Sequence, residues 1–366
     1  MSTPRLITVV RDVLDPLTGT RHDLRWAAGK PVATGTDAGR EIDGTELWIL
    51  PAIYDADAHM PFVTAGVRAF DRQRALAGGV AQMNVALPWQ QIQAMDLAAL
   101  VADLTRDVLP RIIPLLSVSP DDSSAGFPAW LAAHAGEVKM LLPSVCKLYS
   151  YDPYFDANLD AVLAAGLKPM VWCSTEDGLD HVIERIPDGP LHLRHATSAA
   201  MLATMRRAAG ATVQTSPHFL LPLSKAKRDD LTVLPPPVGD DPRQSLVEAC
   251  MAGIDLIASD HGAPGLRRPP GKDSPGLQVQ QHFLSAILTL AELYSWDLGA
   301  LLAKVTSAPA RVFGVEAPQG FTLVDPTWRE PVTLWPDQGS DRAPFEGMAL
   351  RGRVLAVSGG GDVELV

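Results

Sequence analysis

Between residues 50 and 262, the chain alternates short runs of apolar and β-branched residues with longer stretches that have helical spacing. This alternation is typical of parallel strands joined by crossover helices, because helices must cover both faces of a parallel sheet. Helical spacing is clearest in residues 97–109 and 199–210. Eight such units predict a TIM-type (β/α)8 barrel of the α/β class. The predicted strands are residues 50–59, 79–88, 111–119, 145–150, 167–175, 190–197, 212–221 and 255–262.

Both ends of the chain consist of short β-like segments separated by turns. These segments are residues 6–14, 45–50, 321–326, 331–335 and 348–357. Because they enclose the alternating region, we predict a small β-sandwich domain built from residues 1–50 and 321–366 together. The barrel would then span residues 51–320.

Composition narrows the class of protein. A chain of 366 residues with 47% hydrophobic residues can bury a large core. The net charge of −11 argues against a nucleic-acid partner, which requires a broad basic surface. Three cysteines without a CxxC pair favour a reducing compartment. With no signal peptide and no membrane-spanning segment in the sequence, we expect a cytoplasmic protein without membrane contact.

Polar side chains gather at the carboxyl ends of the predicted strands, where TIM barrels hold their active sites. Imidazole and carboxylate groups suit a zinc-like ion, which acidifies a bound water and polarises a carbonyl. The pattern therefore predicts metal-assisted hydrolysis. The strand-end residues are Asp57, His59, Lys147, Ser174, Glu176, His195, His218, Asp260 and His261.

Seven motifs follow one another along the chain. They are LPAIYDADAH, ALAGGVAQMNVALP, CKLYSYDPYFDANLDAV, RHATS, SPHFLL, IASDHGAP and SPGLQ. Each is weak alone, but in this order they resemble the motifs of the dihydroorotase family of the amidohydrolase superfamily. The resemblance extends over nearly the whole chain, and it implies the same barrel with a small β domain from both ends.

The resemblance also implies a chemistry, the reversible opening of a cyclic amide in pyrimidine biosynthesis. In the family, two metals bridged by a carboxylated lysine bind a hydroxide, and an aspartate after the last strand shuttles the proton. The substrate pair would be dihydroorotate and N-carbamoyl-aspartate. Residues that match the family in type and context are His59, Lys147, His195 and Asp260. Asp260 would be the catalytic acid and base and also a metal ligand.

Structural alternatives exist for these assignments. Asp260 could cap a loop, and His195 could be a hydrogen-bonded core histidine. Lys139 is the alternative to Lys147 as the carboxylated lysine. We favour Lys147 because the segment that follows it matches the family without a gap.

Two metal ligands differ from the family. Asp57 replaces the first histidine of the H-x-H pair, and Ser174 replaces a later histidine. A neutral hydroxyl is a poor zinc ligand, so we expect one zinc or similar divalent ion and a weak or absent second metal. The ion would be held by some of the residues Asp57, His59, Lys147, His195 and Asp260.

The substrate contacts differ as well. Pro61, Trp89 and Gly265 stand where the family has the arginine, asparagine and histidine that bind the substrate carboxylate. Trp89 could stack on a flat ring, although a tryptophan is more often part of the core. The predicted substrate-binding residues are Trp89, His218 and His261, and the candidate replacement cations are Arg194, Arg243, Arg267 and Arg268.

Three functions stay open. The first is a dihydroorotase-like hydrolase with a reduced metal site, acting on a cyclic amide or a carbamoyl amino acid. The second is a noncatalytic homologue that supports a homo-oligomer or an aspartate transcarbamoylase partner. The third is an amidohydrolase for another cyclic amide or imide. We favour the first, because a purely structural descendant would not keep His59, Lys147, His195 and Asp260 on four different strands.

Overall fold

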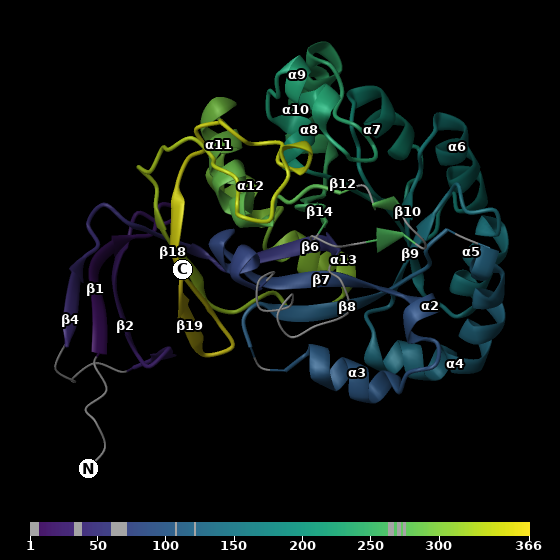
Figure 1. Ribbon diagram of the computed structural model, residues 1–366, viewed down its shortest axis with the longest axis horizontal. Coiled ribbons are helices and arrows are strands. Elements are labelled where there is room, and N and C mark those ends of the chain that lie inside the picture. Colours follow the sequence, from purple (N-terminus) through teal and green to yellow (C-terminus); the bar gives the residue numbers. More distant parts are fainter. Residues whose placement is uncertain are drawn as a thin grey trace.

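The computed structural model of the protein describes residues 7–32, 39–59, 72–106, 108–120, 122–262, 267–268, 272–273 and 276–366. A curled parallel sheet and a mostly antiparallel sheet make up the fold (Figure 1). A short hairpin pairs β15 (Arg267–Arg268) with β16 (Lys272–Asp273). No helix in the described ranges has the length and apolar character needed to cross a membrane.

The parallel sheet closes into a barrel. Its order is β13-β12-β11-β10-β9-β8-β7-β6-β14, and every neighbouring pair is parallel. Both β13 and β14 come from the predicted strand 255–262, so the pairing of β14 with β6 joins the last unit to the first. The predicted barrel is thereby confirmed. The strands are β6 (Ile53–His59), β7 (Val80–Pro88), β8 (Arg111–Ser117), β9 (Val145–Tyr149), β10 (Lys168–Trp172), β11 (Leu191–Leu193), β12 (Ala211–Thr215), β13 (Leu256–Ile257) and β14 (His261–Gly262).

Apolar side chains fill the barrel interior below the polar strand ends. One buried cluster includes Ala56, Leu115, Val145, Met170, Leu256 and Phe313. Successive side chains on a strand alternate between its two faces, so Lys147 lies on the same face as Val145. It lies two residues nearer the carboxyl end of β9. The apolar cluster therefore supports a polar layer at the barrel mouth.

Helices surround the outside of the barrel (Figure 1). Several begin at a side chain that satisfies a free backbone N–H group: Thr175 accepts from Gly178, and Ser198 accepts from Met201. The helices are residues 72–77, α2 (Trp89–Ile92), α3 (Leu97–Leu104), α4 (Phe127–Leu141), α5 (Phe155–Ala164), α6 (Glu176–Arg185), α7 (Ala199–Met205), α8 (Pro217–Leu220), α9 (Lys225–Asp230), α10 (Asp240–Gly253), α11 (Phe283–Leu293), α12 (Leu298–Ala303) and α13 (Ser307–Phe313), with 3-10 turns at Asp122–Gly126, Gln280–His282 and Ser340–Arg342.

The second sheet is built from both ends of the described chain, as predicted. Its order is β19-β18-β17-β5-β1-β2-β3, and β4 pairs with β1. All pairs are antiparallel except those of β1 with β4 and β5. The division of the chain into 1–50 plus 321–366 and 51–320 stays a prediction. The strands are β1 (Ile7–Leu14), β2 (Arg21–Ala27), β3 (Lys30–Pro31), β4 (Arg40–Asp43), β5 (Trp48–Pro51), β17 (Phe321–Asp325), β18 (Arg353–Gly359) and β19 (Asp362–Leu365).

Two predicted strands were wrong in part. In residues 212–221, β12 ends at Thr215 and α8 follows, because Pro217 lacks an amide hydrogen for the ladder and suits the first turn of a helix. Residues 331–335 contribute an isolated bridge between Pro331 and Ala349 to the described fold, not a strand.

Candidate active site

Strand β6 carries Asp55, Asp57 and His59, and a register irregularity between Asp55 and Ala58 interrupts the regular alternation of its side chains. The side chain of Asp55 is buried and accepts hydrogen bonds from the Ser259 amide at 2.9 Å, the Ser259 hydroxyl at 2.6 Å and Gln280 Nε2 at 2.6 Å. Burial raises the pKa of Asp55 to about 6, although these hydrogen bonds act to lower it. Asp55 thereby links the first barrel strand to the residues between β13 and β14 and to the 3-10 turn at Gln280.

Asp57 lies at the centre of a buried ionic cluster. Its Oδ1 accepts from Lys147 Nζ at 2.8 Å. Its Oδ2 accepts from Arg194 Nε at 2.7 Å and from Gln214 Nε2 at 2.9 Å, and Arg194 Nη2 lies 2.6 Å from the same oxygen. Burial alone would raise the pKa of Asp57, but Arg194 and Lys147 hold it well below its usual range. Asp57 is therefore a carboxylate at neutral pH.

His195 and Asp260 both have a left-handed backbone, with φ of 61° and 57°. Non-glycine residues rarely adopt this region, and such conformations concentrate at functional sites. The left-handed turn at His195 interrupts the alternation of the strand, so Arg194 and His195 both reach Asp260 although they are consecutive. Arg194 Nη2 and His195 Nε2 lie 3.6 and 3.7 Å from Asp260 Oδ1.

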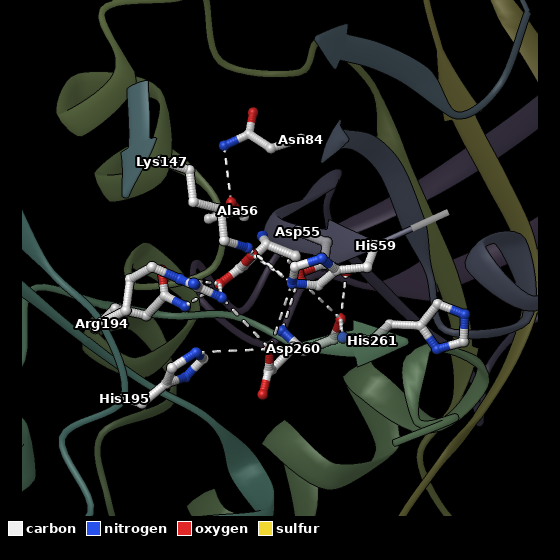
Figure 2. Close-up of polar contacts among 12 residues, drawn as sticks. Asp55, Ala56, His59, Asn84, Lys147, Arg194, His195, Asp260 and His261 are labelled. Atoms are coloured by element: carbon white, nitrogen blue, oxygen red, sulfur yellow. Dashed lines mark hydrogen bonds and ion pairs between the residues drawn. The ribbon is translucent and has the colours of Figure 1, made fainter. Parts of the chain in front are cut away.

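Figure 2 shows Lys147, Arg194, His195 and His59 converging on Asp260 and its surroundings. His59 Nε2 lies 4.0 Å from Asp260 Oδ1. Burial and the negative charge of Asp57 raise the pKa of Asp260 to about 7, against the opposing effect of Arg194 and Lys147. Burial and the neighbouring cations lower the pKa of His59 and of His195 well below the usual value. At neutral pH the cluster therefore combines neutral imidazoles with a carboxyl group close to its midpoint.

The structure brings Lys147 into this cluster and leaves Lys139 on the exposed side of α4. Lys147 Nζ lies 2.8 Å from Asp57 Oδ1 and 2.7 Å from His59 Nε2. Burial and the charge of Arg194 lower the pKa of Lys147 to about 8, although Asp57 opposes the shift. The amine is therefore easier to deprotonate than an ordinary lysine.

A chain of hydrogen bonds orients Gln214 toward Asp57. His192 Nε2 donates to Gln214 Oε1 at 3.1 Å, and the hydroxyl of Thr212 donates to His192 Nδ1 at 2.8 Å. Lys168 Nζ in turn donates to the Thr212 hydroxyl at 3.2 Å. The ionic cluster therefore has ordered support from three neighbouring strands.

Three predicted ligands meet the geometry of a cation site. One ligand atom each from Asp57, His59 and Asp260 all lie within 4.8 Å of one another. Carboxylate oxygen and imidazole nitrogen suit a zinc-like ion, and His195 borders the group. Ser174 is exposed, and no second group of three such ligands forms within the described ranges. The described side chains thus offer ligands for one divalent ion, at a place where Lys147 Nζ now contacts Asp57 Oδ1 and His59 Nε2.

Two predicted substrate-binding residues lie outside this cluster. The His261 ring turns away from Asp260 (Figure 2), and its Nδ1 accepts from the Val279 amide at 3.3 Å. Trp89 is buried against α4, with ring centroids 5.8 Å from Phe127 and 6.0 Å from Trp130. Their roles as substrate contacts stay predictions, and the packing of Trp89 matches the core alternative.

His218 lies nearer the cluster. It is buried beside Phe219, with ring centroids 4.0 Å apart, and neither ring nitrogen has a hydrogen-bond partner among the described residues. Burial lowers the pKa of His218 to about 3, and His218 contributes to the lowered pKa of His195. A neutral, unpaired imidazole next to His195 is compatible with the predicted contact to a substrate.

Of the candidate replacement cations, Arg194 reaches the cluster. Arg243 lies on α10, and its Nη1 donates to the Tyr294 hydroxyl at 2.7 Å. The side chains of Arg267 and Arg268 lie outside the described parts of the chain, as do Pro61 and Gly265.

Sequence reasoning missed Asp55, His192 and Gln214 as members or supports of the site. Asp55 lies two residues before Asp57, but neither the irregularity of β6 between Asp55 and Ala58 nor the contacts of Asp55 with Ser259 and Gln280 can be read from the sequence. His192 and Gln214 sit within apolar strand segments, and their residue types alone do not indicate which strands become neighbours.

Sequence comparison relates the chain to curated dihydroorotases. It is 26% identical over 220 residues to the dihydroorotase of Geobacter metallireducens, with 54% of this chain and 52% of the relative covered. It is 30% identical over 184 residues to that of Pyrobaculum aerophilum, with 47% of this chain and 46% of the relative covered. The chain thus spans about half the length of the curated relatives it matches. No family model matches.

Structural comparison finds the same fold in hydantoinases. The L-hydantoinase (dihydropyrimidinase) from Arthrobacter aurescens has a TM-score of 0.71 at 17% identity, with 98% of this chain and 97% of that chain covered. A dihydropyrimidinase from Brevibacillus agri has a TM-score of 0.68 at 16% identity, with 98% and 95% covered. The resemblance to dihydroorotases and the barrel fold with an added β domain are both confirmed.

Proposed function

We propose that the protein is a cyclic amidohydrolase that opens, and in reverse closes, a ring of the dihydroorotate type with the help of one zinc-like ion. The observation that supports this most directly is the position of Asp260, whose Oδ1 lies within 4.0 Å of Arg194, His195 and His59. The relatives are named for dihydroorotate, and the structural neighbours for hydantoins and dihydropyrimidines. These compounds share an amide within a ring, which is the bond that we propose is cleaved.

The ion would be held by Asp57, His59 and Asp260, with His195 and Lys147 beside it. When bound, such an ion lowers the pKa of a water and polarises the amide carbonyl. Carboxylation of Lys147 would add an oxygen ligand. The lowered pKa of about 8 favours this reaction, because carbon dioxide adds to the neutral amine and one N–H proton is released to solvent as the carbamate forms.

Asp260 would move the proton. As a carboxylate it accepts a proton from the attacking water while the water oxygen adds to the ring carbonyl carbon. It then delivers that proton to the ring nitrogen as the carbon–nitrogen bond breaks. Without an ion, burial and the charge of Asp57 raise the pKa of Asp260 to about 7. A divalent ion beside Asp260 would lower this pKa and favour the carboxylate that accepts the proton. The same steps in reverse close the ring and release water.

The test combines turnover with a variant at Asp260. Purified protein with added zinc is assayed on dihydroorotate, N-carbamoyl-aspartate, hydantoin and dihydrouracil. Asp260→Asn is expected to lower kcat by about 10²- to 10⁴-fold, the usual contribution of a positioned proton donor and acceptor. The matched control is Asp180→Asn, at a surface pair with Arg207 on the outside of the barrel. Absence of turnover on all four compounds, or equal turnover by wild type and Asp260→Asn, would refute the proposal.

A second candidate is a noncatalytic homologue that supports an oligomer or a transcarbamoylase. The observation that favours it is the pairing of Asp57 with both Lys147 and Arg194, which neutralises this carboxylate without an ion. This candidate predicts a protein free of bound metal that co-elutes with a transcarbamoylase on size-exclusion chromatography. Bound zinc together with ring-opening activity would exclude it.

A further inference from the structure

We propose that Arg194 supplies the positive charge that a second metal ion would otherwise carry, and so limits the site to one divalent ion. This inference rests on the proposed function, because it concerns the same site. The Arg194 guanidinium would then determine how many metal ions the site binds, in addition to stabilising the fold.

The contacts of Arg194 place its charge between two carboxylates. Its Nε and Nη2 lie 2.7 and 2.6 Å from Asp57 Oδ2, and the same Nη2 lies 3.6 Å from Asp260 Oδ1. A cation shared by two carboxylates is the arrangement that a bridging metal would otherwise create. Arg194 occupies it with a planar group whose charge is permanent.

The position of this charge is fixed. The Arg194 side chain is 2% exposed, so the guanidinium does not extend into solvent. Its backbone N–H donates to the Val171 carbonyl at 3.0 Å, which extends the pairing with β10 past the end of β11. Withdrawal of the guanidinium to admit a metal would break the ion pair with Asp57, while the backbone bond keeps the Cα of Arg194 in place.

The net charge of the site also disfavours a second divalent ion. With Lys147 as an ammonium, the formal charges of Asp57, Asp260, Lys147 and Arg194 sum to zero, and carboxylation of Lys147 would lower the sum to −2. One divalent ion would balance that sum, whereas a second would leave an excess of two positive charges. The remaining buried carboxyl nearby, Asp55, is already engaged by Ser259 and Gln280. Like charges repel strongly at short range in a buried site, so Arg194 opposes each added cation.

The experiment measures zinc without substrate. Wild type, Arg194→Met and Arg194→Lys are stripped of metal and titrated with zinc against a chromophoric chelator, and bound zinc per chain is measured by mass spectrometry. Wild type should saturate at one ion. Arg194→Met, which keeps the length of the side chain but removes its charge, should bind zinc at least tenfold more tightly. Arg194→Lys should behave as wild type. Arg206→Met is the control, because it removes an arginine that pairs with Asp255 far from the site.

Each outcome decides the inference. Two ions per wild-type chain, or equal or weaker zinc binding by Arg194→Met, overturns it, as does absence of zinc binding in both. Zinc binding by Arg194→Met alone also overturns it, because the wild-type site would then hold no ion instead of one. If Arg194→Met does not fold, Arg194→Gln, which also removes the charge, is titrated in its place. Because no step depends on turnover, the inference can survive or fail separately from the proposed ring-opening activity.

Discussion

Acidification is expected to destabilise the fold through the buried His192. Its side chain is excluded from solvent, its Nδ1 accepts from the Thr212 hydroxyl, and its Nε2 donates to Gln214. A second proton would have to enter at Nδ1, on the side where Lys168 contacts the same hydroxyl. Burial and the charge of Lys168 accordingly lower the pKa of His192 to about 4.

The size and sign of the effect follow from this pKa. The unfolded chain takes up the proton with the ordinary histidine pKa of about 6.5. Between about 6.5 and 4 the unfolded state binds more protons than the native state, so the native state loses stability as the pH falls through this window. The loss from His192 is close to zero at pH 7 and about 2 kcal/mol at pH 5, since each unit of pKa difference corresponds to about 1.4 kcal/mol.

Urea unfolding at pH 7 and pH 5, in the presence of a chelator, measures this contribution. His192→Gln keeps a side chain that can hydrogen bond but does not titrate. Wild type should therefore lose about 2 kcal/mol more than the variant between the two pH values. His22→Gln, at an exposed position in β2, should lose as much as wild type. Equal losses in wild type and His192→Gln would refute the reasoning.

Three further changes test other parts of the structure. Asp57→Ala leaves two buried cations without their anion and should cost about 3–5 kcal/mol in chelator-treated protein, as measured by urea unfolding; a cost below about 1 kcal/mol would contradict the buried ion cluster. Gly262→Ala should cost about 1–3 kcal/mol by thermal unfolding, because the new Cβ would lie 3.0 Å from the Gly276 Cα; an unchanged melting temperature would mean that the two segments can separate freely. Trp89→Leu should lower the melting temperature through lost packing against Phe127 and leave KM unchanged, whereas a raised KM would restore the substrate role.

The barrel could be predicted because its strands are buried on both faces and therefore appear as continuous apolar runs. The boundary of the seventh strand could not be placed in the same way, since an apolar run also describes the short helix that begins at Pro217. Among the polar groups, residues at strand ends carried a positional signal, and the structure gathers His59, Lys147, His195 and Asp260 at the barrel mouth.

Contacts between side chains on different strands of the barrel could not be predicted from positions at strand ends. Gln214 meets Asp57 over a separation of 157 residues, and nothing local to either strand marks the pair. For Trp89, the sequence allowed two interpretations. A tryptophan at a strand end suits a binding surface and a core equally well, and only the packing against α4 distinguishes the two.

The interrupted strand that closes the barrel has a consequence for ligand binding. Residues 258–260 separate β13 from β14, and β14 meets β6 through the pairs His261 with Ala58 and Gly262 with His59. A molecule that binds both Asp260 and His59 connects the first and last strands of the barrel. Binding of this molecule is therefore coupled to the pairing of β14 with β6. A tightly bound ligand should therefore slow amide hydrogen exchange in both β6 and β14, including at amides that the ligand does not contact.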